Sequence, residues 1–84
     1  GVEVDFTGEY NALIVVQKDK PGVVAHITKI LSDRGVNIAF MRLFREEKGH
    51  TAYTIVESDE RLPEGVDALL LENPNITDVM VVQP

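Results

Sequence analysis

The feature that most constrains the fold is the alternation of strand-like and helix-like stretches along the chain. An apolar run of mostly branched residues, Asn11 to Gln17, predicts a buried strand. Pro21–Gly22 ends this pattern, and apolar residues at helical spacing begin directly after it. Because proline suits the first helical position and Gly35 can take the left-handed conformation that ends a helix, we expect a helix from Pro21 to Arg34. Its expected core-facing residues are Val24, Ile27, Ile30 and Leu31.

The remainder of the chain predicts three further strands and one further helix. The expected segments are a strand at 36–46, a hairpin turn at 47–49, a strand at 51–58, a loop from Asp59, a helix that opens at Pro63 and ends before Pro74, and a strand at 76–83. The second helix is expected to turn Val66, Leu69 and Leu70 inward.

The strand at 36–46 contains a conflict between sequence and periodicity. Strict alternation places Arg42 on one face with apolar residues. The other members of that face are Ile38, Phe40 and Phe44. A β-bulge, or a position of Arg42 at the margin of the sheet, would resolve the conflict.

The resulting order, β-α-β-β-α-β, predicts an α+β fold of the ferredoxin-like type. Right-handed crossovers then give one four-stranded antiparallel sheet with both helices on one face. The first and third strands lie in the middle of this sheet, and the second and fourth lie at its edges. The other face of the sheet has no cover from the predicted elements.

Composition excludes several classes of function. The 84 residues carry 14 acidic and 8 basic side chains, a net charge of −6, whereas a nucleic-acid-binding surface needs the opposite balance. The absence of cysteine excludes disulfides, thiolate metal sites and a cysteine nucleophile, and two histidines are too few for a zinc site. No apolar run approaches the roughly 20 residues that span a bilayer. The length predicts one domain, and because the sequence begins with Gly1 rather than Met we expect a piece of a longer protein.

No catalytic arrangement is evident in the sequence. Ser32 and Ser58 have no histidine in a predictable relation to them. His26 is expected within the first helix, facing outward or at the boundary between core and surface, and His50 is expected as a solvated residue of the hairpin turn. An acylphosphatase-type hydrolase would share the fold, but it would need an arginine in the first loop, where this chain has only lysines.

The first loop remains as the candidate binding site. The backbone N–H groups of Gly22, Val23 and Val24 point out of the predicted helix end, where the helix dipole favours an anion. Asp19 places a carboxylate beside these donors, so the loop suits a zwitterion with both a carboxylate and an ammonium group. The alternative is that Asp19 caps the helix and Pro21–Gly22 only makes the turn.

The stretch KPGVVAHITKILSDRGVNI, Lys20 to Ile38, resembles the signature of ACT domains, the small regulatory ligand-binding modules of amino-acid metabolism. The resemblance covers residues 10–84 and leaves residues 1–9 as a lead-in or linker. Within the family, the sequence is most similar to the C-terminal ACT domain of the β subunit of bacterial iron–sulfur L-serine dehydratases. The ACT domain of D-3-phosphoglycerate dehydrogenase is the second match.

The resemblance implies a regulatory, non-catalytic domain that forms a homodimer through an edge strand and binds L-serine or another small amino acid between the two chains. The ligand-contacting positions fall on Gln17 and Asp19, before Pro21–Gly22, and the second chain contributes Asn37. The dehydrogenase has histidine and asparagine where this chain has Gln17 and Asp19, which alters the contacts to the ligand carboxylate.

The resemblance also bears on the parent enzyme. It implies a cytoplasmic lyase that deaminates serine with a [4Fe–4S] cluster, none of whose ligands are in this cysteine-free chain. No cofactor or metal is therefore expected in the domain, and its partners are the amino acid, a second copy and the rest of the parent. The alternatives are a purely structural dimerisation module with an empty loop, and a small hydrolase.

Overall fold

The computed structural model describes residues 11–46 and 50–83. Its elements are β1 (Asn11–Lys18), α1 (Val23–Asp33), β2 (Ile38–Arg45), β3 (Thr51–Ser58), α2 (Val66–Leu71) and β4 (Ile76–Val82). This order confirms the predicted β-α-β-β-α-β pattern. The expected lead-in at 1–9 and hairpin turn at 47–49 lie outside the described residues.

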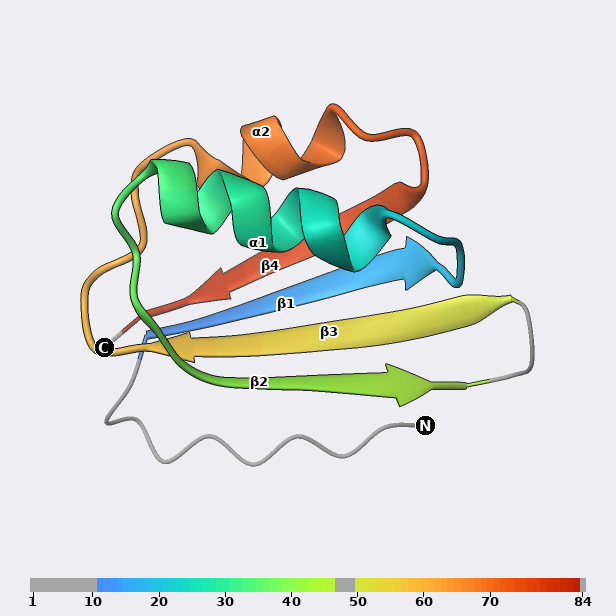
Figure 1. Cartoon of the computed structure of the whole chain (residues 1–84), viewed down its shortest axis with the longest axis horizontal. Coiled ribbons are helices and arrows are strands. Elements are labelled where there is room, and N and C mark those ends of the chain that lie inside the picture. Colours follow the sequence, from blue (N-terminus) through green and yellow to red (C-terminus); the bar gives the residue numbers. More distant parts are fainter. Residues whose placement is uncertain (1–10, 47–49, 84) are drawn as a thin grey trace.

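The four strands form one antiparallel sheet in the order β2-β3-β1-β4. The middle position of β1 and β3 and the edge position of β2 and β4 confirm the predicted ferredoxin-like topology. Both helices lie on the same side of the sheet (Figure 1). Each helix connects a middle strand to an edge strand, in the crossovers β1-α1-β2 and β3-α2-β4. Crossovers of the same hand place both helices on one side of the sheet.

Each helix begins after a glycine in the left-handed conformation. Gly22 (φ 86°) precedes α1 and Gly65 (φ 83°) precedes α2, so the predicted starts at Pro21 and Pro63 are wrong by two and three residues. A residue with positive φ cannot continue a right-handed helix, and each proline therefore lies in the turn before the glycine. The predicted end of α1 is confirmed at Gly35, which has φ 74°.

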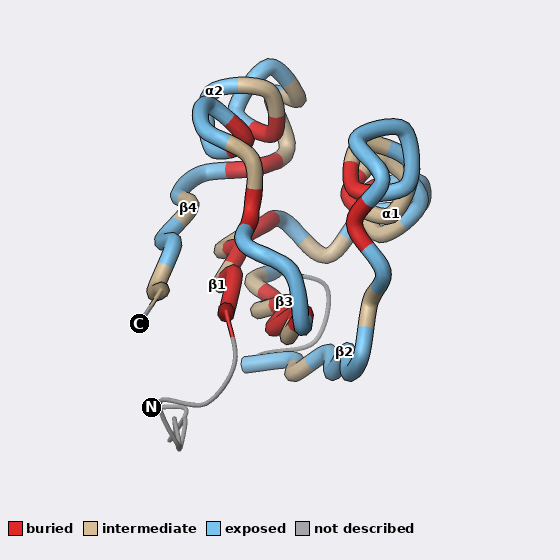
Figure 2. Tube along the Cα trace, turned by 90° about the vertical axis from the view of Figure 1, so that its left-hand side faces the viewer, coloured by how far each residue is buried: buried red, intermediate tan, exposed pale blue. Residues whose placement is uncertain are grey.

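The core lies between the sheet and the two helices, and Figure 2 shows its buried residues along β1, β3 and the inner helix faces. The fully buried members include Leu13, Val15, Val56, Ile27, Leu31, Val66 and Leu70. Because α1 begins at Val23, that residue is buried in place of the predicted Val24, which is half-buried. Leu69, also predicted inward, is half-buried and faces α1.

A bulge in β2 resolves the conflict at Arg42. The pairing of β2 with β3 shifts between Ile38 and Phe40, so Ile38 packs toward the core whereas Phe40 lies on the opposite face. Arg42 and Phe44 then share that open face, with the guanidinium carbon 4.4 Å from the centre of the Phe44 ring. The predicted bulge is confirmed, and it leaves Met41, Leu43 and Arg45 on the helix side.

Candidate functional site

Three backbone hydrogen bonds hold the first loop in place. The Lys18 N–H donates to the Asn75 carbonyl at 2.7 Å, and the Asp19 N–H donates to the His50 carbonyl at 2.9 Å. The Lys20 N–H donates back to the Lys18 carbonyl at 2.8 Å. Because these bonds connect the loop to the turn before β4 and to the start of β3, the loop is positioned by the sheet.

The loop borders an open hollow of about 680 Å³ beside the N-terminus of α1, which we call the first-loop hollow. Its lining residues are Asp19 to Gly22, Val24, Leu43 and Arg45. The first-loop hollow therefore joins the loop, the first turn of α1 and the end of edge strand β2. Gly22 is exposed there, and a Cβ at this position would meet no atom within 4 Å.

The N-terminus of α1 offers backbone donors to the first-loop hollow. The first intrahelical bond runs from the His26 N–H to the Gly22 carbonyl, so the Val23 and Val24 N–H groups have no acceptor within the helix. Among the described residues no side chain caps this end, and the first turn holds no acidic residue. The alternative in which Asp19 caps the helix is therefore wrong.

Asp19 instead forms an ion pair with Arg45. Arg45 Nε lies 3.0 Å from Asp19 Oδ2, and the Asp19 side chain is 16% exposed while that of Arg45 is 69% exposed. The pair places a fixed carboxylate and an accessible guanidinium side by side in the first-loop hollow. An arginine thus reaches the first loop from β2, although the loop sequence itself contains none.

Sequence reasoning missed Arg45 because the residue lies far from the loop along the chain. The register brings the two together, since Arg45 and Gln17 both pair with Ala52, one from each side of β3. Asp19 follows two residues after Gln17. Correct placement of the bulge at the start of β2 would have put Arg45 on the helix face and beside the loop.

The other predicted ligand residue of the loop, Gln17, is buried. Its side chain is on the helix side of β1 with 3% exposure, and its Oε1 accepts a hydrogen bond of 2.7 Å from Thr54 Oγ1.

Asn37 lies at the other end of the molecule from the first-loop hollow. It precedes β2, whose last residue is Arg45, so the two are roughly 25 Å apart at the usual rise of a strand. Its backbone N–H donates to Glu60 Oε1 at 2.9 Å, and its exposed side chain has no partner among the described residues. Within one chain, Asp19, Gly22 and Val24 line the first-loop hollow, Gln17 and Val23 are buried, and Asn37 lies at the other end of β2.

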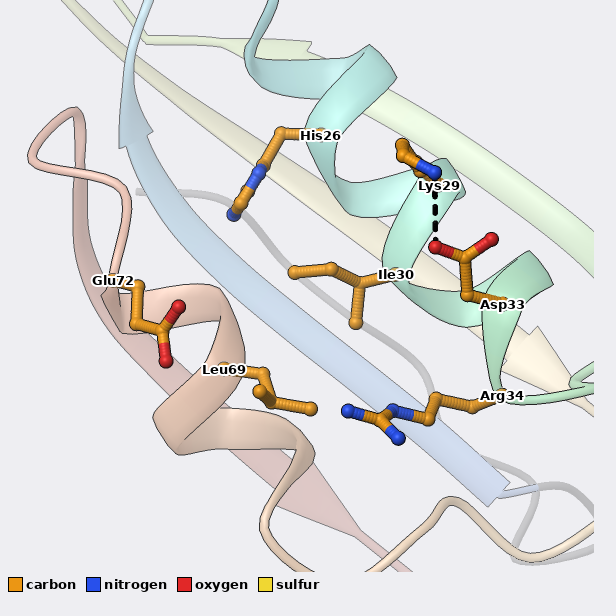
Figure 3. A pocket seen from close by; sticks show the side chains of 7 residues that line it. All are labelled: His26, Lys29, Ile30, Asp33, Arg34, Leu69 and Glu72. Carbon is orange, nitrogen blue, oxygen red and sulfur yellow. Dashed lines mark hydrogen bonds and ion pairs between the residues drawn. The ribbon is translucent and has the colours of Figure 1, made fainter.

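A second, smaller hollow of about 240 Å³ lies between α1 and α2. Figure 3 shows His26 and Ile30 on α1 pointing toward Leu69 on α2, with Glu72 near the His26 end. His26 Nε2 is buried and has no hydrogen-bond partner in the described part of the chain. The residue as a whole is half-buried, which confirms the boundary position predicted for His26.

The described residues contain no group of histidine and acidic side chains placed to hold a metal ion. Within the same residues, no helix is long and apolar enough to cross a membrane. In the first-loop hollow, the carboxylate of Asp19 and the guanidinium of Arg45 lie beside the backbone donors of α1, an arrangement suited to recognition by hydrogen bonds and charge.

Comparison with known proteins identifies the family. The ACT domain family matches residues 11–74. The D-3-phosphoglycerate dehydrogenase of Methanocaldococcus jannaschii is 37% identical over 82 residues, which are 98% of this chain and 16% of that enzyme. The enzyme of the same name from Bacillus subtilis is 30% identical over 99% of this chain and 15% of its own length.

The serine dehydratases are also related. The probable L-serine dehydratase beta chain of Bacillus subtilis is 29% identical over 94% of this chain and 36% of its own length. The comparisons thus favour the dehydrogenases over the dehydratase that the sequence resemblance put first. The C-terminal domain of the Mycobacterium tuberculosis MgtC protein shares the fold, with a TM-score of 0.69 at 17% identity over 96% of this chain and 94% of that domain. With the ACT match over most of its length and a ferredoxin-like sheet of the predicted order, the chain belongs to the ACT domain family.

Proposed function

We propose that this ACT domain is the regulatory module of a serine-metabolism enzyme and that it binds L-serine in the first-loop hollow. The observation that carries the proposal is the convergence of uncapped N–H groups of α1, Asp19 and Arg45 in the first-loop hollow, within the part of the chain that matches the ACT family. Gln17, Asp19, Gly22, Val23 and Val24 supply one side of the site. Val23 contributes only its backbone, because its side chain is in the core.

The other side of the site is Asn37 of a second copy. Asn37 and the first-loop hollow lie at opposite ends of β2, and an antiparallel two-fold pairing of two β2 edges brings opposite ends together. Among the described residues, β2 carries three exposed large apolar side chains, Phe40, Met41 and Leu43, against Met80 and Val81 on β4, which supports β2 as the pairing strand. The asparagine amide can both donate to a ligand carboxylate and accept from a ligand hydroxyl or ammonium.

For the parent enzyme we propose a D-3-phosphoglycerate dehydrogenase, because two relatives of that name match nearly the whole domain at 37% and 30% identity. The second candidate is the cytoplasmic iron–sulfur L-serine dehydratase, supported by the 29% match to its beta chain. In both cases the catalysed reaction belongs to the rest of the parent enzyme, and for the dehydratase so does the [4Fe–4S] cluster. The domain adds control by an amino acid.

Calorimetric titration of the 84-residue chain with L-serine tests the proposal. We expect saturable heat at one site per chain, and a five-fold or greater loss of affinity in Asn37→Ala without a change in melting temperature above a few degrees. The absence of a binding heat with serine, glycine, alanine and other small amino acids at millimolar concentration would support the alternative of a purely structural dimerisation module.

Sedimentation equilibrium tests the dimer separately. Leu43→Glu on β2 should weaken self-association, whereas Met80→Glu, on the other edge strand and 54% exposed against 46% for Leu43, should leave it unchanged. A monomer at all concentrations, with and without serine, would contradict the two-chain site. Loss of association in Met80→Glu alone would move the interface to β4.

A further inference from the structure

Arg45 has free hydrogen-bonding capacity in the first-loop hollow. Its contact with Asp19 is made by Nε, and a guanidinium carries five N–H donors, so further donors remain for a ligand. The Arg45 side chain is 69% exposed, so it is accessible to a ligand. A guanidinium presents its N–H groups in a planar fork that matches a carboxylate.

Asp19 presents the opposite charge at the same place. Its side chain is only 16% exposed, and one oxygen is engaged by Arg45. A carboxylate accepts about four hydrogen bonds, so acceptor sites remain for a second donor. Without Arg45, this negative charge beside the helix end would repel a ligand carboxylate.

The ion pair therefore changes what the first loop can recognise. An α-amino acid carries its ammonium and carboxylate on one carbon, with the same close spacing of opposite charges as the Asp19–Arg45 pair. The ligand ammonium can approach Asp19 while the ligand carboxylate approaches the Nη atoms of Arg45 and the N–H groups after Gly22. Each charge then meets its opposite.

We infer that Arg45 is a ligand-binding residue that anchors the α-carboxylate, and that the Asp19–Arg45 pair selects α-amino acids over hydroxy acids and simple amines. The inference rests on the proposed function and adds to it a residue and the basis of its selectivity. Of the other lining side chains, Pro21, Val24 and Leu43 are apolar and suit a small uncharged side chain, and Lys20 adds a second positive charge to the hollow.

The test compares three probes on the same chain: L-serine, L-glycerate, which replaces the ammonium by a hydroxyl, and ethanolamine, which lacks the carboxylate. We expect L-serine to bind at least ten-fold more tightly than either of the others. Equal binding of L-serine and L-glycerate would overturn the selection by charge.

The variants separate the role of Arg45 from a general effect of charge. Arg45→Ala should weaken serine binding ten-fold or more, and Arg45→Lys should restore part of the loss, since it keeps the charge without the fork. Asp19→Asn should reduce the preference for serine over glycerate. The matched control is Arg42→Ala, which removes an arginine of the same strand on the open face and should change affinity less than two-fold.

Two failures are distinguishable. If the unsubstituted chain binds serine and the affinity of Arg45→Ala is within two-fold of it, the role given to Arg45 is wrong and the proposed function stands. If the unsubstituted chain binds no small amino acid, both the proposed function and this inference are wrong. Circular dichroism melts of each variant establish that a lost affinity is not lost folding.

Discussion

Thr54 Oγ1 donates a 2.7 Å hydrogen bond to Gln17 Oε1 between the two middle strands of the sheet. Both side chains are buried, at 0% and 3% exposure, on the face that the helices cover. The bond fixes the glutamine two residues before Asp19, so a polar pair inside the core orients the start of the first loop. This position links the stability of the sheet to the geometry of the proposed site.

Thr54→Val should therefore destabilise the fold. The change removes the donor and leaves the buried Gln17 oxygen unpaired, at a cost of about 1–3 kcal/mol. Gln17→Leu in the same chain should recover part of that loss, because both polar groups are then gone. Urea unfolding of the unsubstituted chain, the two single variants and the double variant measures the coupling free energy between Thr54 and Gln17. Additive effects of the two changes would show that the bond contributes nothing.

Gly22 should tolerate asparagine far better than valine. A Cβ at this position meets nothing within 4 Å, but φ is 86°, so the cost comes from the backbone conformation rather than from a clash. A residue with a side chain in the left-handed region costs about 1–2 kcal/mol, and asparagine is the least affected. Thermal melts of Gly22→Asn and Gly22→Val, with exposed Pro21→Ala as control, check this ranking. Equal stability of the two Gly22 variants would contradict it.

Tyr53 should titrate at higher pH than an ordinary tyrosine. Its hydroxyl donates to Glu46 Oε2, and this hydrogen bond to a carboxylate raises the pKa of Tyr53 above the ordinary 10.0. Since the folded pKa is the higher one, the stabilisation is complete below pH 10 and is lost as pH rises through the folded pKa. Tyrosinate absorbance in a Tyr10→Phe background isolates Tyr53. An unchanged pKa in Glu46→Gln would exclude this cause.

His26→Leu should leave the stability of the domain unchanged or increase it. The buried Nε2 has no partner among the described residues, and a buried unpaired polar atom costs about 1–3 kcal/mol. Leucine also has the higher helix propensity. His50→Leu, at an exposed position outside a helix, is the control for removing a histidine. A loss of melting temperature in His26→Leu alone would show that the imidazole has a stabilising role between α1 and α2.

The order of elements and the sheet topology are predictable from the sequence because they follow from apolar runs and handedness. The helix starts are not, since Pro21 and Pro63 satisfy the usual rule for a first helical residue while Gly22 and Gly65 adopt positive φ. That conformation depends on how the chain leaves the strand or loop before it. The shift of the first turn also exchanges Val24 for Val23 in the core.

The loop part of the site is predictable, because Asp19 and Gly22 are neighbours in sequence. Arg45 is not, since its approach depends on a one-residue bulge at the start of β2 that decides which face every later side chain takes. Asn37 is predictable as a turn residue, but its distance from the loop follows only from the length of β2. The part of the site that depends on a second chain lies beyond what one chain's sequence specifies.

The most direct test of the central claim is a two-dimensional amide NMR titration of the labelled chain with L-serine. We predict that the amides of Asp19 and Gly22 to Val24 shift together with that of Asn37, with one dissociation constant, because ligand bound in a two-chain site contacts both ends of each protomer. Amides that do not shift at tens of millimolar serine, or shifts confined to the hollow between α1 and α2, would contradict the account.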